Sequence, residues 1–237
     1  MNLRSHFTYV ALACLLLVTG CASTTISDRD EADTGQLPVP NNIWVYDFAA
    51  SSGDVPAASA LYGQIGEHNS PQTAQQLAQG SKVGAELASE LTSQIDAMGL
   101  PAKLAGAGTR PVNGDLVIHG YIIAIVKGDR DERVAIGLGE GNSELKAAVE
   151  VFEMTANGLE KLGGGDTDAT GNKTPGAGVG LISMLATHNP LGLIVSSGMK
   201  VYDEKTGEAT ISGRVKQTAT EIAGILKKQF QQQDWIN

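Results

Sequence analysis

Three stretches of the chain have the apolar patterns of β-strands. Residues 43–48 are rich in β-branched and aromatic side chains, which favours an extended strand. Residues 116–126 form an almost unbroken apolar run, which predicts a central strand buried on both faces. Residues 144–154 alternate instead, which predicts a half-buried strand. Its core side carries Leu145, Ala147, Val149 and Val151, and its solvent side carries Glu144, Lys146 and Glu150.

Two further stretches have the period of an amphipathic helix. The first begins at Ser70, which precedes a proline as a helix-capping residue does, and its apolar stripe ends at Met98 before a glycine. The second carries an apolar stripe from Val215 to Phe230, with lysines toward its C-terminal end where the helix dipole favours cations. Both segments are therefore expected to pack one face inward.

A turn completes the predicted sheet. The pair Asn157-Gly158 is typical of a tight hairpin and leads into a short strand over residues 159–162. One strand, a helix, two or three more strands and a closing helix predict an α+β fold, with helices on one face of a small mixed or antiparallel sheet.

The N-terminus has the form of a secretion signal over residues 1–20. A polar start containing Arg4 leads into an apolar run from Phe7 to Val18, which is shorter than the about 20 apolar residues that span a bilayer. The run ends at Val18-Thr19-Gly20-Cys21, which resembles the lipobox of bacterial lipoproteins. This resemblance implies cleavage before Cys21 and acylation of its thiol. The alternative is an ordinary signal peptide with an incidental cysteine.

Cysteine usage agrees with a lipid anchor. The chain has 2 cysteines, and Cys14 lies inside the signal segment, so the mature protein would keep Cys21 alone. Acylation would explain this lone thiol in a secreted protein. In lipoproteins of two-membrane bacteria, the residue after the cysteine directs sorting. Ala22 there implies transfer to the periplasmic face of the outer membrane.

Low apolar content predicts a flexible tether over residues 21–42, and a single α+β domain follows over residues 43–237. Loss of Arg4 with the signal leaves 16 basic against 26 acidic residues, a net charge of −10. Nucleic acid is therefore not an expected partner, and the membrane contact is expected to come from the acyl chains.

Several segments together resemble a family of bacterial lipoproteins known as domain of unknown function 4410. They are the strand ending Tyr46-Asp47-Phe48, the segment Gly114 to Tyr121, the stretch Arg133 to Val151 and the ending Phe230 to Ile236. The sequence departs from the family at Asp234, where glycine is expected before the tryptophan. The family has no assigned activity, so the resemblance implies an address and a fold but no chemistry.

Candidate chemistry is sparse, and no cofactor is expected. The run Asp166-Thr167-Asp168-Ala169-Thr170-Gly171 matches the opening of a calcium loop, with ligands at Asp166, Asp168 and Thr170, but Ala177 stands where the bidentate glutamate belongs. A solvated glycine-rich loop is the favoured interpretation, and weak calcium binding is the alternative. His119 lies in an apolar strand, where a hydrogen-bonded core histidine is favoured over a general base. We therefore expect no enzyme.

Two segments suggest contacts with other molecules. A charged tip, Asp129-Arg130-Asp131-Glu132-Arg133, is a candidate partner contact. The glycine-rich apolar segment 174–199 contains no charged residue and is long enough to cross a bilayer. The sequence His188-Asn189-Pro190 in its middle favours two short helices packed on the sheet instead.

These observations leave two main functional hypotheses. The first is a membrane-anchored binding or scaffold module of the cell envelope, whose partner is an unknown envelope protein. The second is a subunit that assembles with its own copies through segment 174–199 into a membrane-associated, export-type complex. An envelope hydrolase is a more distant alternative.

Overall fold

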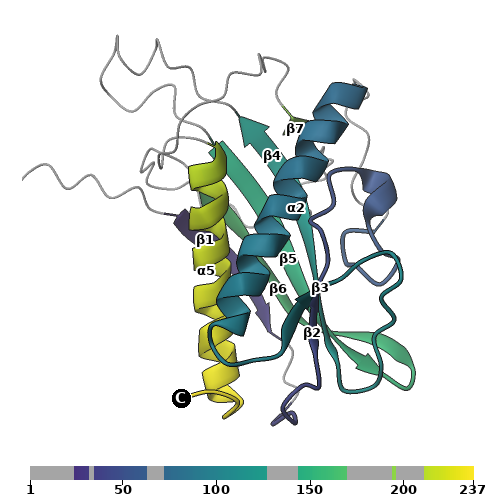
Figure 1. Cartoon of the computed structure of the whole chain (residues 1–237), viewed down its shortest axis with the longest axis vertical. Coiled ribbons are helices and arrows are strands. Elements are labelled where there is room, and N and C mark those ends of the chain that lie inside the picture. The colour runs from purple at the N-terminus through teal and green to yellow at the C-terminus, as the bar shows by residue number, and fades with distance from the viewer. Residues whose placement is uncertain (1–23, 32–34, 63–71, 127–143, 170–193, 196–210) are drawn as a thin grey trace, which may run out of the picture.

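The computed structural model describes residues 24–31, 35–62, 72–126, 144–169, 194–195 and 211–237. Within them, two long helices pack on one face of a mixed sheet, which confirms the predicted fold class (Figure 1). The elements are β1 (Thr24–Glu31), β2 (Ile43–Val45), η1 (Ser52–Asp54), α2 (Ala74–Asp96), β3 (Ala102–Leu104), β4 (Leu116–Val126), β5 (Glu144–Thr155), β6 (Gly158–Ala169), β7 (Ile194–Val195) and α5 (Ile211–Gln232).

The strands follow the order β1-β6-β5-β4-β2-β3, and β7 pairs with β4 beyond the end of β2. The pairs β1–β6, β6–β5 and β5–β4 are antiparallel, whereas β2 runs parallel to both β3 and β4. The turn into β6 has Gly158 at φ 111°, a conformation that glycine adopts without steric cost. The strand β3 was not predicted, since its three residues are too few to show a period.

The first long helix begins later than predicted. Its N-cap is Thr73, whose Oγ1 accepts a 3.2 Å hydrogen bond from the Gln76 amide, while the Gln76 side chain accepts a 2.8 Å bond from the Thr73 amide. This reciprocal capping box satisfies two backbone donors that the helix cannot pair internally. The prediction of Ser70 as the N-cap is therefore wrong.

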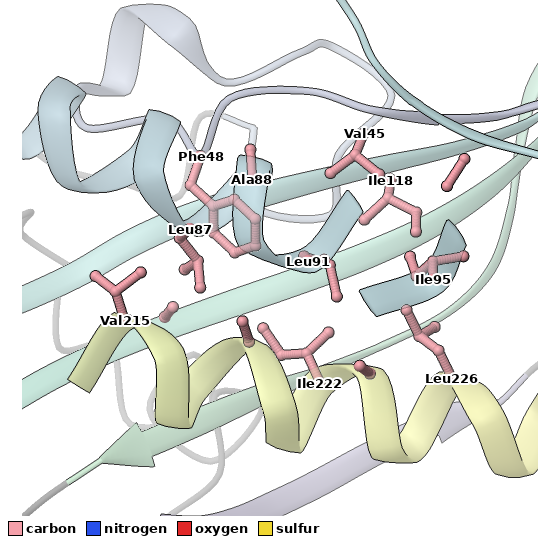
Figure 2. Close-up of a cluster of buried hydrophobic side chains, with 14 of the residues drawn as sticks. Val45, Phe48, Leu87, Ala88, Leu91, Ile95, Ile118, Val215, Ile222 and Leu226 are labelled. Carbon is pink, nitrogen blue, oxygen red and sulfur yellow. The ribbon is translucent and has the colours of Figure 1, made fainter. Parts of the chain in front are cut away.

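The main core lies between the helices and the sheet. Figure 2 shows Val215, Ile222 and Leu226 along α5 pointing toward the α2 side chains and the sheet beneath. Both apolar stripes read from the sequence are buried here. The buried members on α2 are Val83, Leu87, Ala88, Leu91 and Ile95, and those on α5 are Val215, Ala219, Ile222, Ala223, Leu226 and Phe230.

Phe48 packs closely against both α2 and β4. Its backbone carbonyl would lie 2.1 Å from a Cβ built on Gly84 of α2, and its ring would lie 2.1 Å from a Cβ on Gly120 of β4. Any side chain at either glycine would therefore displace Phe48 from the core. The Phe48 amide also donates a 3.3 Å hydrogen bond to the Gly84 carbonyl.

The expectation of a flexible tether over residues 21–42 needs correction. Residues Thr24–Glu31 form β1, which pairs antiparallel with β6. Farther along, the Leu37 amide donates a 2.6 Å hydrogen bond to the Gln233 side chain, and the Leu37 carbonyl accepts a 2.9 Å bond from Trp235 Nε1. Apolar content is a poor guide here, because the backbone pairing of an edge strand does not require apolar side chains.

The end of α5 explains why glycine is expected at position 234. Asp234 has φ 58°, and the Trp235 amide donates a 2.9 Å hydrogen bond to the Phe230 carbonyl, which together form a Schellman-type helix end. The Trp235 ring stacks on the Phe230 ring with centroids 5.4 Å apart. Aspartate tolerates the left-handed conformation less well than glycine does.

Most of the glycine-rich segment 174–199 lies outside the described residues. Ile194 and Val195 form the short strand β7, so the expectation of helix does not hold for these two. None of the helices among the described residues is both long and apolar enough to cross a membrane.

Candidate functional site

The sheet face away from the helices carries a cluster of polar and aromatic side chains. In the antiparallel ladder, His119 lies opposite Glu150 and Tyr121 lies opposite Ala148, so these side chains share one face. Phe152 follows on the same side of β5. We call this side the open face.

Glu150 is the centre of this cluster, and only 4% of its surface is exposed. Its Oε2 accepts hydrogen bonds from Ser59 Oγ at 2.5 Å and from the Tyr121 hydroxyl at 2.9 Å. Its Oε1 accepts a 3.0 Å bond from the Ala60 amide and lies 3.3 Å from Lys161 Nζ. Each carboxylate oxygen thus has two donors, which is the arrangement that a buried charge requires. We call Glu150 and these partners the Glu150 cluster.

Gly164 of β6 lies opposite Glu150 in the ladder. A Cβ there would lie 2.9 Å from the Val149 carbonyl oxygen, closer than side-chain atoms pack, whereas Glu150 Cγ at 3.4 Å and Lys161 Cε at 3.6 Å would be at ordinary van der Waals distance. The Lys161 side chain remains 29% exposed, so the cation reaches the carboxylate from the surface. The prediction that the Glu150 side of β5 faces solvent is therefore wrong, because a crossing segment covers it.

That covering segment, residues 50–62, seals a second small core on the open face. The buried apolar side chains there are Ala49, Val55, Leu61, Tyr121 and Ala148. Ser59 Oγ also accepts a 2.9 Å bond from the Leu61 amide, so one hydroxyl connects the segment to itself and to Glu150. Burial raises the pKa of Tyr121 well above its ordinary value, so its hydroxyl stays a donor.

His119 sits beside this cluster between two aromatic rings. Its ring stacks on Tyr46 with centroids 4.6 Å apart and meets the edge of Phe152 at 5.8 Å. Burial lowers the pKa of His119 to about 4, although the negative charge of Glu150 opposes that shift. Burial also raises the pKa of Tyr46. His119 is therefore neutral near pH 7 and contributes a flat, half-buried surface. We call Tyr46, His119 and Phe152 the His119 stack.

A second buried carboxylate, Asp115, joins β2 to the start of β4. It accepts 2.9 Å bonds from the Asn42 side chain and from Trp44 Nε1, and a 3.0 Å bond from the Val112 amide. Burial by itself would raise the pKa of Asp115, but these donors outweigh it and hold the pKa below its usual range. Asp115 thus has a structural role at the end of the sheet.

Several residues singled out in the sequence lie outside the described part of the chain. They are Cys21, Thr170 and the charged tip from Asp129 to Arg133. Asp166 and Asp168 are described, and both lie in β6 between β1 and β5. These two residues do not adopt the turn that a calcium loop requires. Across the described ranges, no group of three or more His, Cys, Asp or Glu residues is placed to hold a metal ion.

The geometry favours a structural role for the carboxylate and a contact role for the rings. A carboxylate with four donors has no free lone pair directed at a substrate, so Glu150 is poorly arranged for proton transfer. The sequence drew attention to His119 but missed Glu150, Ser59 and Lys161. A charged residue within an alternating strand is ordinarily read as solvent-facing. The Gly163-Gly164-Gly165 run beside it was the one available signal of close packing.

The chain belongs to the family described as Domain of unknown function (DUF4410), whose model matches residues 43–187. The matched range begins at β2 and includes α2, the open face and all of β6, but it excludes β1 and α5. No curated protein matches the chain.

Two solved structures that resemble the chain are PelC dodecamers from Paraburkholderia phytofirmans. One, a single-substitution variant, is 14% identical, with a TM-score of 0.37 over 70% of this chain and 91% of that one. The other is 11% identical, with a TM-score of 0.36 over 83% of this chain and 98% of that one.

Proposed function

We propose that this protein is a lipoprotein of the cell envelope that is anchored through acyl chains on Cys21 and acts by binding another envelope protein. The anchor rests on the signal-like N-terminus and the lipobox-like tetrad. The binding role rests on the open face, which presents ordered aromatic surface on the side of the sheet that the two long helices leave uncovered. The proposal places the protein at the outer membrane and assigns it no catalytic activity.

The observation that carries the binding role is the half-buried Tyr46 and His119 of the stack, together with the exposed Tyr62 at the end of the covering segment. Tyr46 and His119 of the stack are half-buried, Phe152 beneath them is fully buried, and His119 is neutral near pH 7. Tyr62, the last residue of the covering segment, is 58% exposed. Rigid aromatic surface is typical of the contact regions of protein interfaces. The Glu150 cluster holds this surface in place.

Photo-crosslinking in intact cells tests the binding role. A benzophenone amino acid at Tyr62 samples the open face, and the same probe at Ser89, an exposed position on α2, is the matched control. The proposal predicts one discrete adduct from Tyr62 and none of that mass from Ser89. Equal adducts from both positions, or none from Tyr62, would count against an open-face partner.

Assembly from copies of the chain is the second candidate function. It is favoured by β3, the terminal strand of the sheet, which carries Leu104 at 47% exposure. A terminal strand with an exposed apolar side chain offers backbone and side-chain contacts to another chain.

Sedimentation of the purified acylated protein in detergent separates the two candidates. Assembly predicts a defined oligomer that dissociates in Leu104→Lys but not in Val112→Lys, a substitution at another exposed apolar position, 59% exposed. A monomer over the accessible concentration range would exclude self-assembly through β3.

A further inference from the structure

One end of the sheet gathers several strand ends and the start of a helix. Thr24, the first residue of β1, pairs with Ala169, the last residue of β6, and Val126 at the end of β4 pairs with Glu144 at the start of β5. Helix α5 also starts at this end, while the C-terminus lies at the other (Figure 1). We call this the anchor end, defined by Thr24, Val126, Ala169 and Ile211.

At the opposite end of the sheet, residues that follow α5 bind the chain segment between β1 and β2. Trp235 Nε1 donates to the Leu37 carbonyl at 2.9 Å, and Gln233 Nε2 donates to the Gly35 carbonyl at 2.9 Å. The chain therefore runs from the anchor end along β1 and reaches the C-terminus of α5 only after β1 has ended. A helix of 22 residues, as α5 is, separates the two ends by about 30 Å.

Only a short stretch of chain separates Cys21 from the anchor end. Three peptide steps join Cys21 to Thr24, and each trans step spans at most about 3.8 Å between Cα atoms. The Cys21 Cα therefore lies within about 11 Å of the first residue of β1. An acyl group on its thiol leaves no long tether between the bilayer and the domain.

Described residues that flank the uncharged part of the chain also lie at this end. The described residues on either side of it are Ala169, the β7 pair Ile194–Val195 beside Ile125, and Ile211. Between Lys173 and Lys200 the sequence contains no charged residue. The chain therefore leaves and re-enters the described fold on the same side of the domain as Thr24.

We propose that the anchor end rests on the bilayer surface, so that α5 rises from the membrane and the C-terminus points away from it. This inference deepens the proposed function, since it assumes the acylated Cys21. The ligand of this surface is the phospholipid layer itself. A second copy covering the same end is the competing occupant, and the experiment distinguishes the two.

Fluorescence quenching by lipid measures the orientation directly. Ser212→Cys and Gln232→Cys place a thiol at the two ends of α5, where both native side chains are exposed. With Cys14 removed and Cys21 acylated, each variant has a single reactive thiol for a fluorophore. The acylated protein is reconstituted into vesicles of phosphatidylethanolamine and phosphatidylglycerol, with and without doxyl-labelled lipid. Because quenching is short-ranged, the inference predicts several-fold stronger quenching at position 212 than at position 232.

Equal quenching at the two positions, or stronger quenching at position 232, would overturn the inference. Protection of position 212 from aqueous iodide without lipid quenching would also overturn it, in favour of a second copy at this end. The mass of the N-terminal peptide is measured on the same sample. An unmodified Cys21 would refute the proposed function, whereas an acylated Cys21 with equal quenching would refute the orientation alone.

Discussion

The hydroxyl of Tyr121 on β4 donates a 2.9 Å hydrogen bond to Oε2 of Glu150 on β5, beneath a segment that closes over both. Ser59 and Ala60 of that segment bind the same carboxylate, and Lys161 approaches it from β6. One side chain thus joins three neighbouring parts of the domain, and it holds the aromatic surface beside it in position.

Glu150→Gln should therefore destabilise the domain. All four groups around the carboxylate are donors, so an amide would direct at least one N–H toward another donor and would lose the attraction of Lys161. We expect a loss of about 1–3 kcal/mol in the free energy of unfolding. Denaturant titration checks this, with Glu160→Gln, an exposed carboxylate on β6, as the control expected within about 0.5 kcal/mol. A loss in Glu150→Gln no larger than in the control would mean that the cluster contributes little.

The low pKa of His119 makes stability depend on pH. Its pKa is about 4 in the folded protein and 6.5 when unperturbed, so the unfolded state binds more protons between these values. Stability should be complete above about pH 6.5 and should fall as the pH drops toward 4. Between pH 7 and pH 4.5 the protein should lose about 1–3 kcal/mol more than His119→Phe, since one pKa unit corresponds to about 1.4 kcal/mol. Denaturant titrations at both pH values decide this, and identical pH dependence in the two proteins would show that His119 is not the titrating group.

The strand β1 should contribute to stability although its sequence is polar. Replacing Thr24–Glu31, 8 residues, with glycine and serine keeps the chain length but weakens the pairing that covers β6. In a soluble form that begins after Cys21, we expect the Tm to fall by at least about 5 °C, given about 2–4 °C per kcal/mol in domains of this size. Differential scanning calorimetry measures it. An unchanged Tm would restore the flexible tether that composition suggested.

Glycine at position 234 should stabilise the domain, because it favours the left-handed backbone conformation found there. Asp234→Gly removes the steric cost of φ 58° at the end of α5 and loses only an exposed 2.7 Å bond from Gln36. We expect a gain of about 0.5–1 kcal/mol, whereas Asp234→Val should lose about 1 kcal/mol or more. Thermal unfolding of both variants provides the comparison. The reverse order of stability would contradict the Schellman-type ending.

The sequence predicted those elements whose apolar pattern alone determines their position. The strand at 116–126 was placed at the residues it occupies, and both helix stripes are buried as expected, because period and burial have the same physical cause. The sequence did not predict features whose structure depends on residues far away along the chain. β1 is a strand because β6 lies beside it, and Glu150 is buried because residues 59 and 60 return to cover it. His119 was noticed as a polar residue in an apolar run, but its aromatic neighbours come from β5 and from the chain just after β2, which local pattern cannot reveal.

Mass spectrometry of the N-terminal peptide from the membrane-purified protein tests the central claim, that Cys21 anchors this domain to a membrane. We expect a mature chain that begins at Cys21 and carries the mass of diacylglycerol on its sulfur. In Cys21→Ala, that lipid should be absent and the signal segment should remain uncleaved at this position. A mature N-terminus elsewhere, or an unmodified Cys21 thiol in the membrane fraction, would show that Cys21 is not the lipid anchor.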